Sequence, residues 1–370
     1  MSLFFSSKVA SQFNCLEFVG PRVTPEDGIT GYTSDHTQGP ACSVACGPAT
    51  CVRNYFVDMP GGQKGQSAAN QINNLADVSA AIGNEPNGRY FEVTNGYTMA
   101  SANSLEEMMR AGSPMAAASA AAAGGDEAAR EAILELLRVG VHSDTVVTSS
   151  NWGRKPSAFP DSGPEAQLVT QVFGSAISVS YSGISAQAWA PLATLILDAS
   201  YEATLLAGLE ARARHKGGGA SNVVYLTLLG GGVFGNPIKW IADAIYRACT
   251  RLAGSGLDVR IVVYSGYPEP EISSAVKRFA REQSERQAAA VAPAPPSPGP
   301  AAAGPFRHAI TQATYDKAVD EIVDEGSASA AEARRDAVAM FEAQGVDLSG
   351  VDVTGGAGAS AGAVAEGTSS

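Results

Sequence analysis

The chain has 370 residues, more than the roughly 100–200 of one typical domain, and 45% of them are hydrophobic while 17% are charged. This composition supplies enough apolar surface for a core and excludes a chain that is disordered throughout. The formal net charge is −12, with −7 on residues 306–370 and −5 on residues 1–305, so neither part has the basic surface that nucleic acid or an anionic membrane attracts.

The N-terminal sequence MSLFFSSKVASQFN has an apolar run too short for a signal peptide, and we find no stretch of about 20 apolar residues. The five cysteines are an odd number, and the four- and five-residue spacings of Cys42, Cys46 and Cys51 do not fit a zinc knuckle. We therefore expect free thiols, no metal, no cofactor, and residence in the cytoplasm or nucleus.

Strand-like and helix-like segments alternate along residues 1–287. The strand candidates are Lys8–Gln12, Arg89–Thr94, Thr145–Ser149, Thr170–Tyr181, Val223–Leu229 and Val259–Ser265. The helix candidates are Ser67–Ala81, Ser104–Arg110, Asp126–Arg138, Ala188–Arg214, Pro237–Leu252 and Pro270–Ala289, with a low-complexity insertion or frayed helix end at Ala116–Gly125. In Ala188–Arg214, one stripe carries Leu192, Leu195, Ile196, Ala199, Ala203 and Leu206. This order predicts an α/β fold with a mixed sheet covered by helices on both faces.

A glycine-rich loop follows the strand Val223–Leu229 and leads into the helix that Pro237 opens. Consecutive glycines let backbone N–H groups turn inward as an anion-binding nest at a helix N-terminus. We therefore predict that the loop binds a phosphate or diphosphate, with Phe234 free to pack on a ribose or base. Its residues are Gly230, Gly231, Gly232, Val233, Phe234, Gly235 and Asn236. The alternative is a tight strand-to-helix turn without a ligand.

This strand, loop and helix resemble the second phosphate-binding loop of macrodomains. Near the N-terminus, VASQFN (Val9–Asn14) resembles the macrodomain strand that ends in Asn-Ala-Ala-Asn, although Gln12 and Phe13 depart from that pattern. TQGPACSVACG (Thr37–Gly47) lies where macrodomains carry their first glycine-rich loop. The resemblance implies a macrodomain-like three-layer α/β/α fold that binds ADP-ribose or a related nucleotide diphosphate, with ADP-ribose or an ADP-ribosylated protein as the partner. The alternative is a non-catalytic ADP-ribose reader or a scaffold for protein interactions. The resemblance also implies a second activity, hydrolysis of an ADP-ribosyl linkage. The departures from the macrodomain pattern at Gln12 and Phe13 argue against this activity.

The resemblance makes the polar first loop the other half of the candidate site. Asn14 would hydrogen-bond the ribose hydroxyls, and Gln38 and Gly39 would present backbone amides to the ligand. Asp35 or Glu17 would orient a water as general base if the chain is an enzyme. The alternative is that these side chains face solvent or cap turns and helices.

Asn151-Trp152-Gly153-Arg154-Lys155 is a basic and aromatic run, but five residues are too few for a nucleic-acid surface. We interpret this run as an exposed loop.

The proline- and alanine-rich run at residues 288–305 predicts a disordered linker, and residues 354–370 predict a disordered tail. Residues 306–353 between them read as a helical pair, Gln312–Glu325 and Ala330–Gln344. Tyr315, Val319, Ile322 and Val323 share a face of the first helix, and Ala333, Ala337, Val338 and Phe341 share a face of the second. This segment resembles the N-terminal region of armadillo repeat-containing protein six, most specifically in FEAQGVDLSG (Phe341–Gly350), and the resemblance implies an element that binds a protein partner.

Overall fold

A computed structural model describes residues 4–85, 88–121, 127–160, 162–163, 165–215, 221–263, 266–291, 316–320, 322, 329–343 and 353. The chain divides into two units, residues 1–290 and residues 291–370. Each unit is considered by itself below.

The first unit is built on a five-stranded sheet in the order β4-β7-β1-β8-β9. β1 (Phe4–Ala10) runs parallel to β7 (Leu168–Gly174) and to β8 (Val223–Leu226), and β8 runs parallel to β9 (Asp258–Ile261). β4 (Gly140–Val146) is antiparallel to β7 at one edge. The carboxyl ends of the four parallel strands therefore meet at one end of the sheet, the place where ligands bind in open α/β sheets.

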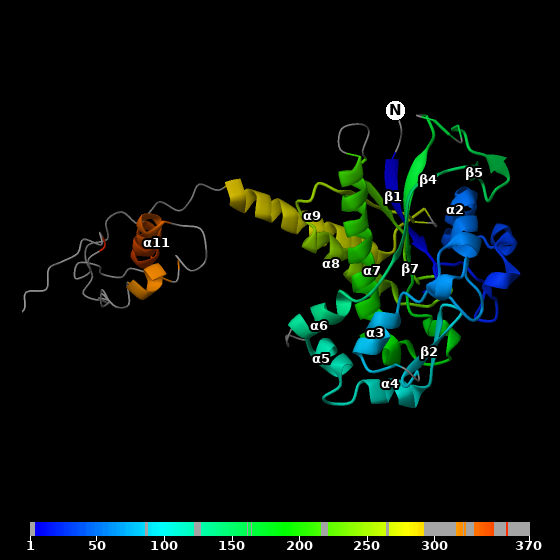
Figure 1. The fold of residues 1–370 in the computed structure, drawn as a ribbon, viewed down its shortest axis with the longest axis horizontal. Coiled ribbons are helices and arrows are strands. Elements are labelled where there is room, and N and C mark those ends of the chain that lie inside the picture. The colour runs from blue at the N-terminus through cyan, green and yellow to red at the C-terminus, as the bar shows by residue number, and fades with distance from the viewer. Residues whose placement is uncertain are drawn as a thin grey trace, which may run out of the picture. The chain divides into compact units, whose positions relative to one another are not determined.

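Helices cover both faces of this sheet (Figure 1). α7 (Ala186–Arg214) packs on β7, β1 and β8 and against α8 (Ile238–Arg251), while α1 (Gln38–Ala45) and α2 (Gly47–Cys51) contact β1 and β4. Neighbouring residues of a strand point to opposite faces. Lys8 of β1 donates to Ser200 of α7 on one face, and on the other Gln171 of β7 donates to the carbonyl of Cys42 in α1. The molecule thus has the predicted three layers, helix, mixed sheet and helix.

The remaining elements surround this framework. They are α3 Ala76–Ala81, β2 Phe91–Thr94, β3 Tyr97–Ala100, α4 Ala102–Met108, α5 Pro114–Ala121, α6 Glu127–Leu134, β5 Ser149–Ser150, β6 Lys155–Pro156 and α9 Pro270–Val291, with a π-helical turn Val52–Phe56 and short 3-10 turns Pro25–Asp27, Thr30–Ser34, Pro60–Gly62 and Val179–Tyr181. Strands β2–β3 and β5–β6 form two separate hairpins.

Several predicted elements differ from those observed. The helix predicted at Ser67–Ala81 begins only at Ala76, and the strand predicted at Thr170–Tyr181 ends at Gly174. The low-complexity stretch Ala116–Gly125 is helical as far as Ala121. Ala118 of this stretch is fully buried, so part of the supposed insertion belongs to the core; residues 122–126 lie outside the described residues.

The long helix α7 buries a stripe that follows the predicted spacing in its first half. Leu192, Leu195 and Ile196 are fully buried, whereas Leu206 is 48% exposed and Leu205 is buried in its place. α7 is also long and apolar enough to cross a membrane, with a mean hydropathy of 1.3 over its most apolar window. This corrects the prediction that no such stretch exists. Two thirds of that window is buried inside the protein, as expected of a core helix.

The second unit is described only in part. Residues 316–320 are helical, and α11 (Ala330–Ala343) matches the second predicted helix to within one residue. Val319 packs with Ala333, Ala337 and Phe341, which belong to the apolar faces predicted for the two helices. Ser329 precedes α11 and hydrogen-bonds Glu332, as an N-cap residue does. Tyr315, Val323 and nearly all of the predicted linker and tail, residues 288–305 and 354–370, lie outside the described residues; α9 continues through residues 288–291.

Candidate functional site

A cavity of about 230 Å³ lies at the carboxyl ends of β1, β7 and β8. The first loop, the β2–β3 hairpin and the loop before α8 complete its walls. Its lining residues are Ala10, Ser11, Gln12, Glu17, Phe18, Val19, Asp35, Thr37, Gln38, Gly39, Pro40, Tyr97, Ala176, Tyr181, Thr227, Leu228, Leu229, Gly230, Gly232, Val233 and Phe234. The two loops singled out from the sequence therefore face one another across a single cavity.

The loop between β8 and α8 offers unused backbone donors to this cavity. Gly231 N–H donates to the Leu228 carbonyl, Gly235 N–H to Gly232, and Asn236 N–H to Gly230, at 2.9–3.0 Å. Among the described residues, no acceptor is found for the four other amides of the loop, those of Gly230, Gly232, Val233 and Phe234. These four residues are also the loop residues that line the cavity, so the amides without an acceptor belong to residues of the cavity wall.

Two glycines of the loop are required by the backbone and by close packing. Gly230 has φ +73°, and a Cβ there would come within 2.5 Å of the Cβ of Ala176. Gly235 has φ +72°, and a Cβ there would come within 2.0 Å of Ser180 Oγ. These φ values lie in the left-handed region that glycine adopts at little cost. The loop therefore holds its shape through Gly230 and Gly235, while Gly232 has open space around it.

Three aromatic rings form another wall of the cavity. The ring of Tyr97 lies 4.8 Å from that of Tyr181 and 5.4 Å from that of Phe234, and the Tyr181 and Phe234 rings are 5.7 Å apart. Phe234 is 7% exposed because it packs in this group. This corrects the expectation that its ring is free to cover a ligand, because the ring packs against Tyr97 and Tyr181 at angles of 53° and 78° while all three residues line the cavity.

The first loop is fixed by its own hydrogen bonds at the end of β1. Gln38 donates from Nε2 to the carbonyl of Lys8 and accepts from the amide of Ala10, both at 2.9 Å. A Cβ on Gly39 would come within 1.9 Å of the Ala10 carbonyl oxygen, so α1 begins in direct contact with β1. Asp35 Oδ1 accepts from the amide of Thr37 at 3.0 Å, and its half-buried carboxylate lines the cavity.

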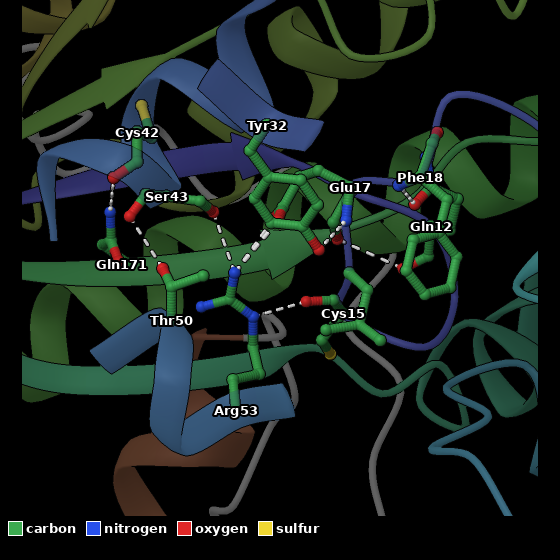
Figure 2. Close-up of polar contacts among 12 residues, drawn as sticks. Gln12, Cys15, Glu17, Phe18, Tyr32, Cys42, Ser43, Thr50, Arg53 and Gln171 are labelled. Carbon is green, nitrogen blue, oxygen red and sulfur yellow. Dashed lines mark hydrogen bonds and ion pairs between the residues drawn. The ribbon is translucent and has the colours of Figure 1, made fainter. Parts of the chain in front are cut away.

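Glu17 lies at the cavity wall in a buried ion pair with Arg53 (Figure 2). Arg53 Nη2 is 3.0 Å from Glu17 Oε2 and 2.8 Å from Ser43 Oγ, and Arg53 Nε donates to the carbonyl of Cys15. Burial raises the pKa of Glu17, while the Arg53 guanidinium and the hydroxyls of Ser43 and Tyr32 oppose the rise. Glu17 is thus a carboxyl group positioned by fixed partners and shifted toward the protonated form.

The structure separates the predicted site residues into two groups. Those on the cavity wall are Glu17, Asp35, Gln38, Gly39, Gly230, Gly232, Val233 and Phe234, and those away from it are Asn14, Gly231, Gly235 and Asn236. Asn14 is fully buried and donates to Gln71 Oε1 while accepting from the amide of Leu16. Asn236 donates to the carbonyl of Ile177 at 2.8 Å. Both side chains hold loops in place instead of facing the cavity.

Other cavity residues were not predicted from the sequence. Gln12 bonds the backbone of Phe18 in both directions, accepting at 2.7 Å and donating at 3.1 Å, and so closes the first loop over the cavity. Tyr97 follows the turn Asn95-Gly96, a dipeptide that predicts a hairpin and could have located β3. Nothing local in the sequence brings Tyr97 next to Phe234, because that contact joins segments 137 residues apart.

The described residues contain no group of three or more His, Cys, Asp or Glu side chains arranged to hold a metal ion. The five cysteines are free. Burial raises the pKa of Cys15 and Cys249 to about 11 and that of Cys42 to about 12, so these thiols stay protonated near neutral pH.

A second cavity of about 200 Å³ lies among α8, β9 and α9. Ile245, Leu257, Phe279 and other mostly apolar side chains line it. Because no carboxylate is found among its described lining residues, whereas Glu17 and Asp35 line the first cavity, we place the candidate site in the first cavity.

Comparisons with known proteins match this chain to one family and to solved structures of one enzyme, each over part of its length. Residues 307–358 match the family described as Armadillo repeat-containing protein 6 N-terminal domain, a match confined to the second unit. No curated protein matches the chain. Two solved structures of poly(ADP-ribose) glycohydrolase from Deinococcus radiodurans, both in complex with ADP-ribose, are 16% and 15% identical to this chain and match 39% of it with a TM-score of 0.28. The chain spans 53% of those chains. A TM-score of 0.28 is too low to support an argument about the fold. The fold described above is therefore based on the sheet topology and the layers of this chain alone.

Proposed function

We propose that the first cavity binds ADP-ribose or a related nucleoside diphosphate. The observation that carries this proposal is that the residues of the loop Gly230–Phe234 whose amides have no acceptor are the same ones that line the cavity. Backbone N–H groups that converge on one space bind phosphate oxygens without any cationic side chain. Among the described residues that line the cavity there is no Lys or Arg, so a phosphate bound there would depend on uncharged donors such as these amides.

The other walls suit the remaining parts of such a ligand. The rings of Tyr97, Tyr181 and Phe234 offer an apolar surface on which a ribose or base can pack. Asp35, which also lines the cavity, offers a carboxylate that accepts hydrogen bonds from ribose hydroxyls. The resemblance of the loop to the second phosphate-binding loop of macrodomains points to the same ligand.

A second candidate function, hydrolysis of an ADP-ribosyl linkage, is favoured by Glu17. A carboxyl group on a ligand cavity with a raised pKa is the kind of group that serves as a general acid or base. In this reading Glu17 or Asp35 orients the attacking water. The ion pair argues against this role, because Arg53 Nη2 already lies 3.0 Å from Glu17 Oε2 and so engages the carboxylate that would have to bind the water. Binding without hydrolysis is therefore our first proposal.

Calorimetric titration with ADP-ribose tests binding, with adenosine as the control that lacks phosphates. We expect ADP-ribose to bind and adenosine to bind at least tenfold more weakly, because two or more charge-assisted hydrogen bonds are lost. Equal affinities, or no binding of ADP-ribose, would contradict the proposal. Incubation with an ADP-ribosylated protein, followed by detection of released ADP-ribose, separates the two functions, and Glu17→Gln abolishes release if Glu17 acts as the acid or base.

We further propose that the second unit contributes an interaction element for a protein partner. Its support is the packed pair of apolar helix faces at Val319 and Phe341 and the match of residues 307–358 to an N-terminal domain found beside armadillo repeats. In this arrangement the first unit recognises an ADP-ribosylated protein while the second brings a partner to it. Cytoplasmic or nuclear residence stays a prediction from the sequence.

A further inference from the structure

The strand β9 lies at an edge of the five-stranded sheet. Within the described part of the chain it pairs with β8 alone, and no strand lies beyond it. Asp258 N–H donates to the Asn222 carbonyl at 2.8 Å, so the backbone groups of Asp258 point toward β8. Because alternate residues of a strand direct their backbone groups to the same side, those of Val259 and Ile261 point away from β8, toward the open edge.

This open edge is a template for pairing with another strand. In the described ranges, no loop hydrogen-bonds the backbone of Val259 or Ile261. Charged side chains commonly protect an edge strand, because they repel a second strand that approaches. β9 carries two charges, Asp258 and Arg260, but they have opposite signs and form an exposed ion pair with each other, with Arg260 Nε 3.0 Å from Asp258 Oδ2. They therefore repel some pairings and attract others.

The sequence Leu257-Asp258-Val259-Arg260-Ile261 is complementary to itself when two copies run antiparallel. With Val259 opposite Val259 of the partner subunit, each Asp258 lies opposite an Arg260, and each Leu257 lies opposite an Ile261. The central Val259 pair exchanges both of its hydrogen bonds, because its backbone groups face the edge. The charged pairs then fall at the positions between hydrogen-bonded pairs, where facing side chains lie closest. Opposite charges and apolar side chains in such cross-strand positions stabilise the pairing.

The same charges disfavour the neighbouring registers. A register centred on Asp258 places two carboxylates directly opposite each other, and a register centred on Arg260 places two guanidinium groups opposite each other. Like charges in directly opposed positions destabilise an antiparallel pair. The charges therefore select the register centred on Val259.

The two faces of β9 suit this pairing in different ways. Leu257, Val259 and Ile261 line the second cavity together with α8 and α9, and Val276 of α9 beside them is 50% exposed. Pairing of two copies would place these apolar side chains next to those of the partner and remove apolar surface from water. The charged side chains of Asp258 and Arg260 would meet on the opposite face, since neighbouring residues of a strand point to opposite faces.

We propose that two copies of this chain associate through antiparallel pairing of their β9 strands, which joins the two five-stranded sheets into one. This inference goes beyond the proposed ligand binding and does not depend on it, because β9 contributes no residue to the described wall of the first cavity. Antiparallel pairing directs the carboxyl ends of the parallel strands of the two copies in opposite directions. The two first cavities then lie toward opposite ends of the joined sheet.

Sedimentation velocity of the full chain over a series of concentrations tests the pairing. We expect a monomer–dimer equilibrium with a Kd on the order of 10 µM, because the pairing of one short strand forms a small interface. Asp258→Arg and Arg260→Asp should each weaken the association about tenfold or more, because each variant places like charges opposite one another. An equimolar mixture of the two variants should associate as tightly as wild type, because opposite charges then meet again across the pairing.

The matched control is Asp58→Arg, which makes the same charge change in the exposed ion pair of Asp58 with Lys64, outside β9. It should dimerise as wild type does. Val259→Pro removes a donor from the open edge and keeps the side of β9 that pairs with β8, so it should also weaken the dimer. Circular dichroism verifies that each variant is folded, and Val259→Pro decides the question if a charge variant is not.

Four results would overturn the proposal. The first is a wild type that stays monomeric at about 200 µM, well above the expected Kd. The second is undiminished dimerisation of the folded β9 variants, which would place the interface elsewhere. The third is a mixture of the two charge variants that stays monomeric. The fourth is loss of the dimer in Asp58→Arg, which would show a general effect of charge.

Discussion

Two ionisable side chains of the first unit are buried by different means. Glu17 is compensated by a cation, whereas Lys8 lies fully buried on β1 with only neutral acceptors, Ser200 Oγ at 2.8 Å and Thr204 Oγ1 at 2.9 Å. Its ammonium also lies 5.0 Å from the centre of the Tyr201 ring. Burial lowers the pKa of Lys8 to about 7, so the protein pays a free-energy cost to keep it charged.

This depressed pKa predicts a stability that rises with pH. Between pH 7 and about 10.5, the unfolded chain binds the Lys8 proton and the folded chain releases it, so raising the pH favours the folded state. The gain is on the order of 5 kcal/mol at most, about 1.4 kcal/mol for each pH unit of the window. Urea unfolding of wild type and Lys8→Met across this window should show the difference in unfolding free energy changing in favour of wild type. A difference that stays constant with pH would show that Lys8 does not titrate there.

The Glu17–Arg53 pair predicts a large loss when one partner is removed. Arg53→Met keeps an apolar stem near the Phe173 ring, which the guanidinium approaches to 3.8 Å, but leaves the Glu17 carboxylate buried alone. We expect a loss of about 3–5 kcal/mol in unfolding free energy, measured by urea unfolding. The double variant Glu17→Gln/Arg53→Met should recover part of it. A loss below about 1 kcal/mol in the single variant would mean that the pair contributes little.

At the scale of elements, a local sequence pattern predicted a structure only where that structure depends on neighbouring residues. The glycine run after Val223–Leu229 predicted a loop between a strand and a helix, and the structure has this loop between β8 and α8, because glycine gives the backbone the freedom that the turn needs. It could not show that Gly231 packs toward Ile241 and Ile238 instead of the cavity, since that depends on where α8 lies. Asn14 was likewise assigned to the ligand by motif, but its partner Gln71 is 57 residues away and became visible only in the fold. The alternation of strand-like and helix-like segments predicted the layers, whereas the contacts between distant segments that form the cavity appear only in the fold.

Substitution by alanine should have different effects on stability at two glycines of the loop, Gly235 with a positive φ and Gly232 in open space. Gly235→Ala forces a side chain into a φ of +72° and against Ser180 Oγ, and we expect it to lower the unfolding free energy by about 1–3 kcal/mol. Gly232→Ala meets open space and should leave stability within about 0.5 kcal/mol. Thermal or urea unfolding of the two variants provides the comparison. Equal losses would show that the loop conformation differs from the one described.

At the scale of the whole molecule, the chain joins an α/β unit with its own cores to a smaller helical unit. The cavity is formed entirely by residues 10–234 of the first unit. We therefore expect the first unit by itself to bind the proposed ligand, and the net charge of −7 on residues 306–370 is unfavourable for binding a phosphate.

This division predicts where a protease cuts first. Residues 292–305 are rich in Ala, Pro, Gly and Ser and contain no large aliphatic or aromatic side chain, so they have little with which to form a core. Brief digestion with elastase should release a fragment that ends in this range, identified by intact-mass measurement, and this fragment should keep the affinity of the full chain for ADP-ribose. A first cut within α7 or α8 would contradict the division.

The most direct test of the account is an amide NMR titration of protein labelled with ¹⁵N at Gly, Val and Phe. If the loop binds the phosphates of ADP-ribose, the amide protons of Gly230, Gly232, Val233 and Phe234 gain an acceptor and shift downfield. The amides of Gly231 and Gly235 already donate within the loop and should shift much less. Shifts concentrated at those four amides are the predicted result; shifts elsewhere, or none at saturating ADP-ribose, would contradict the account.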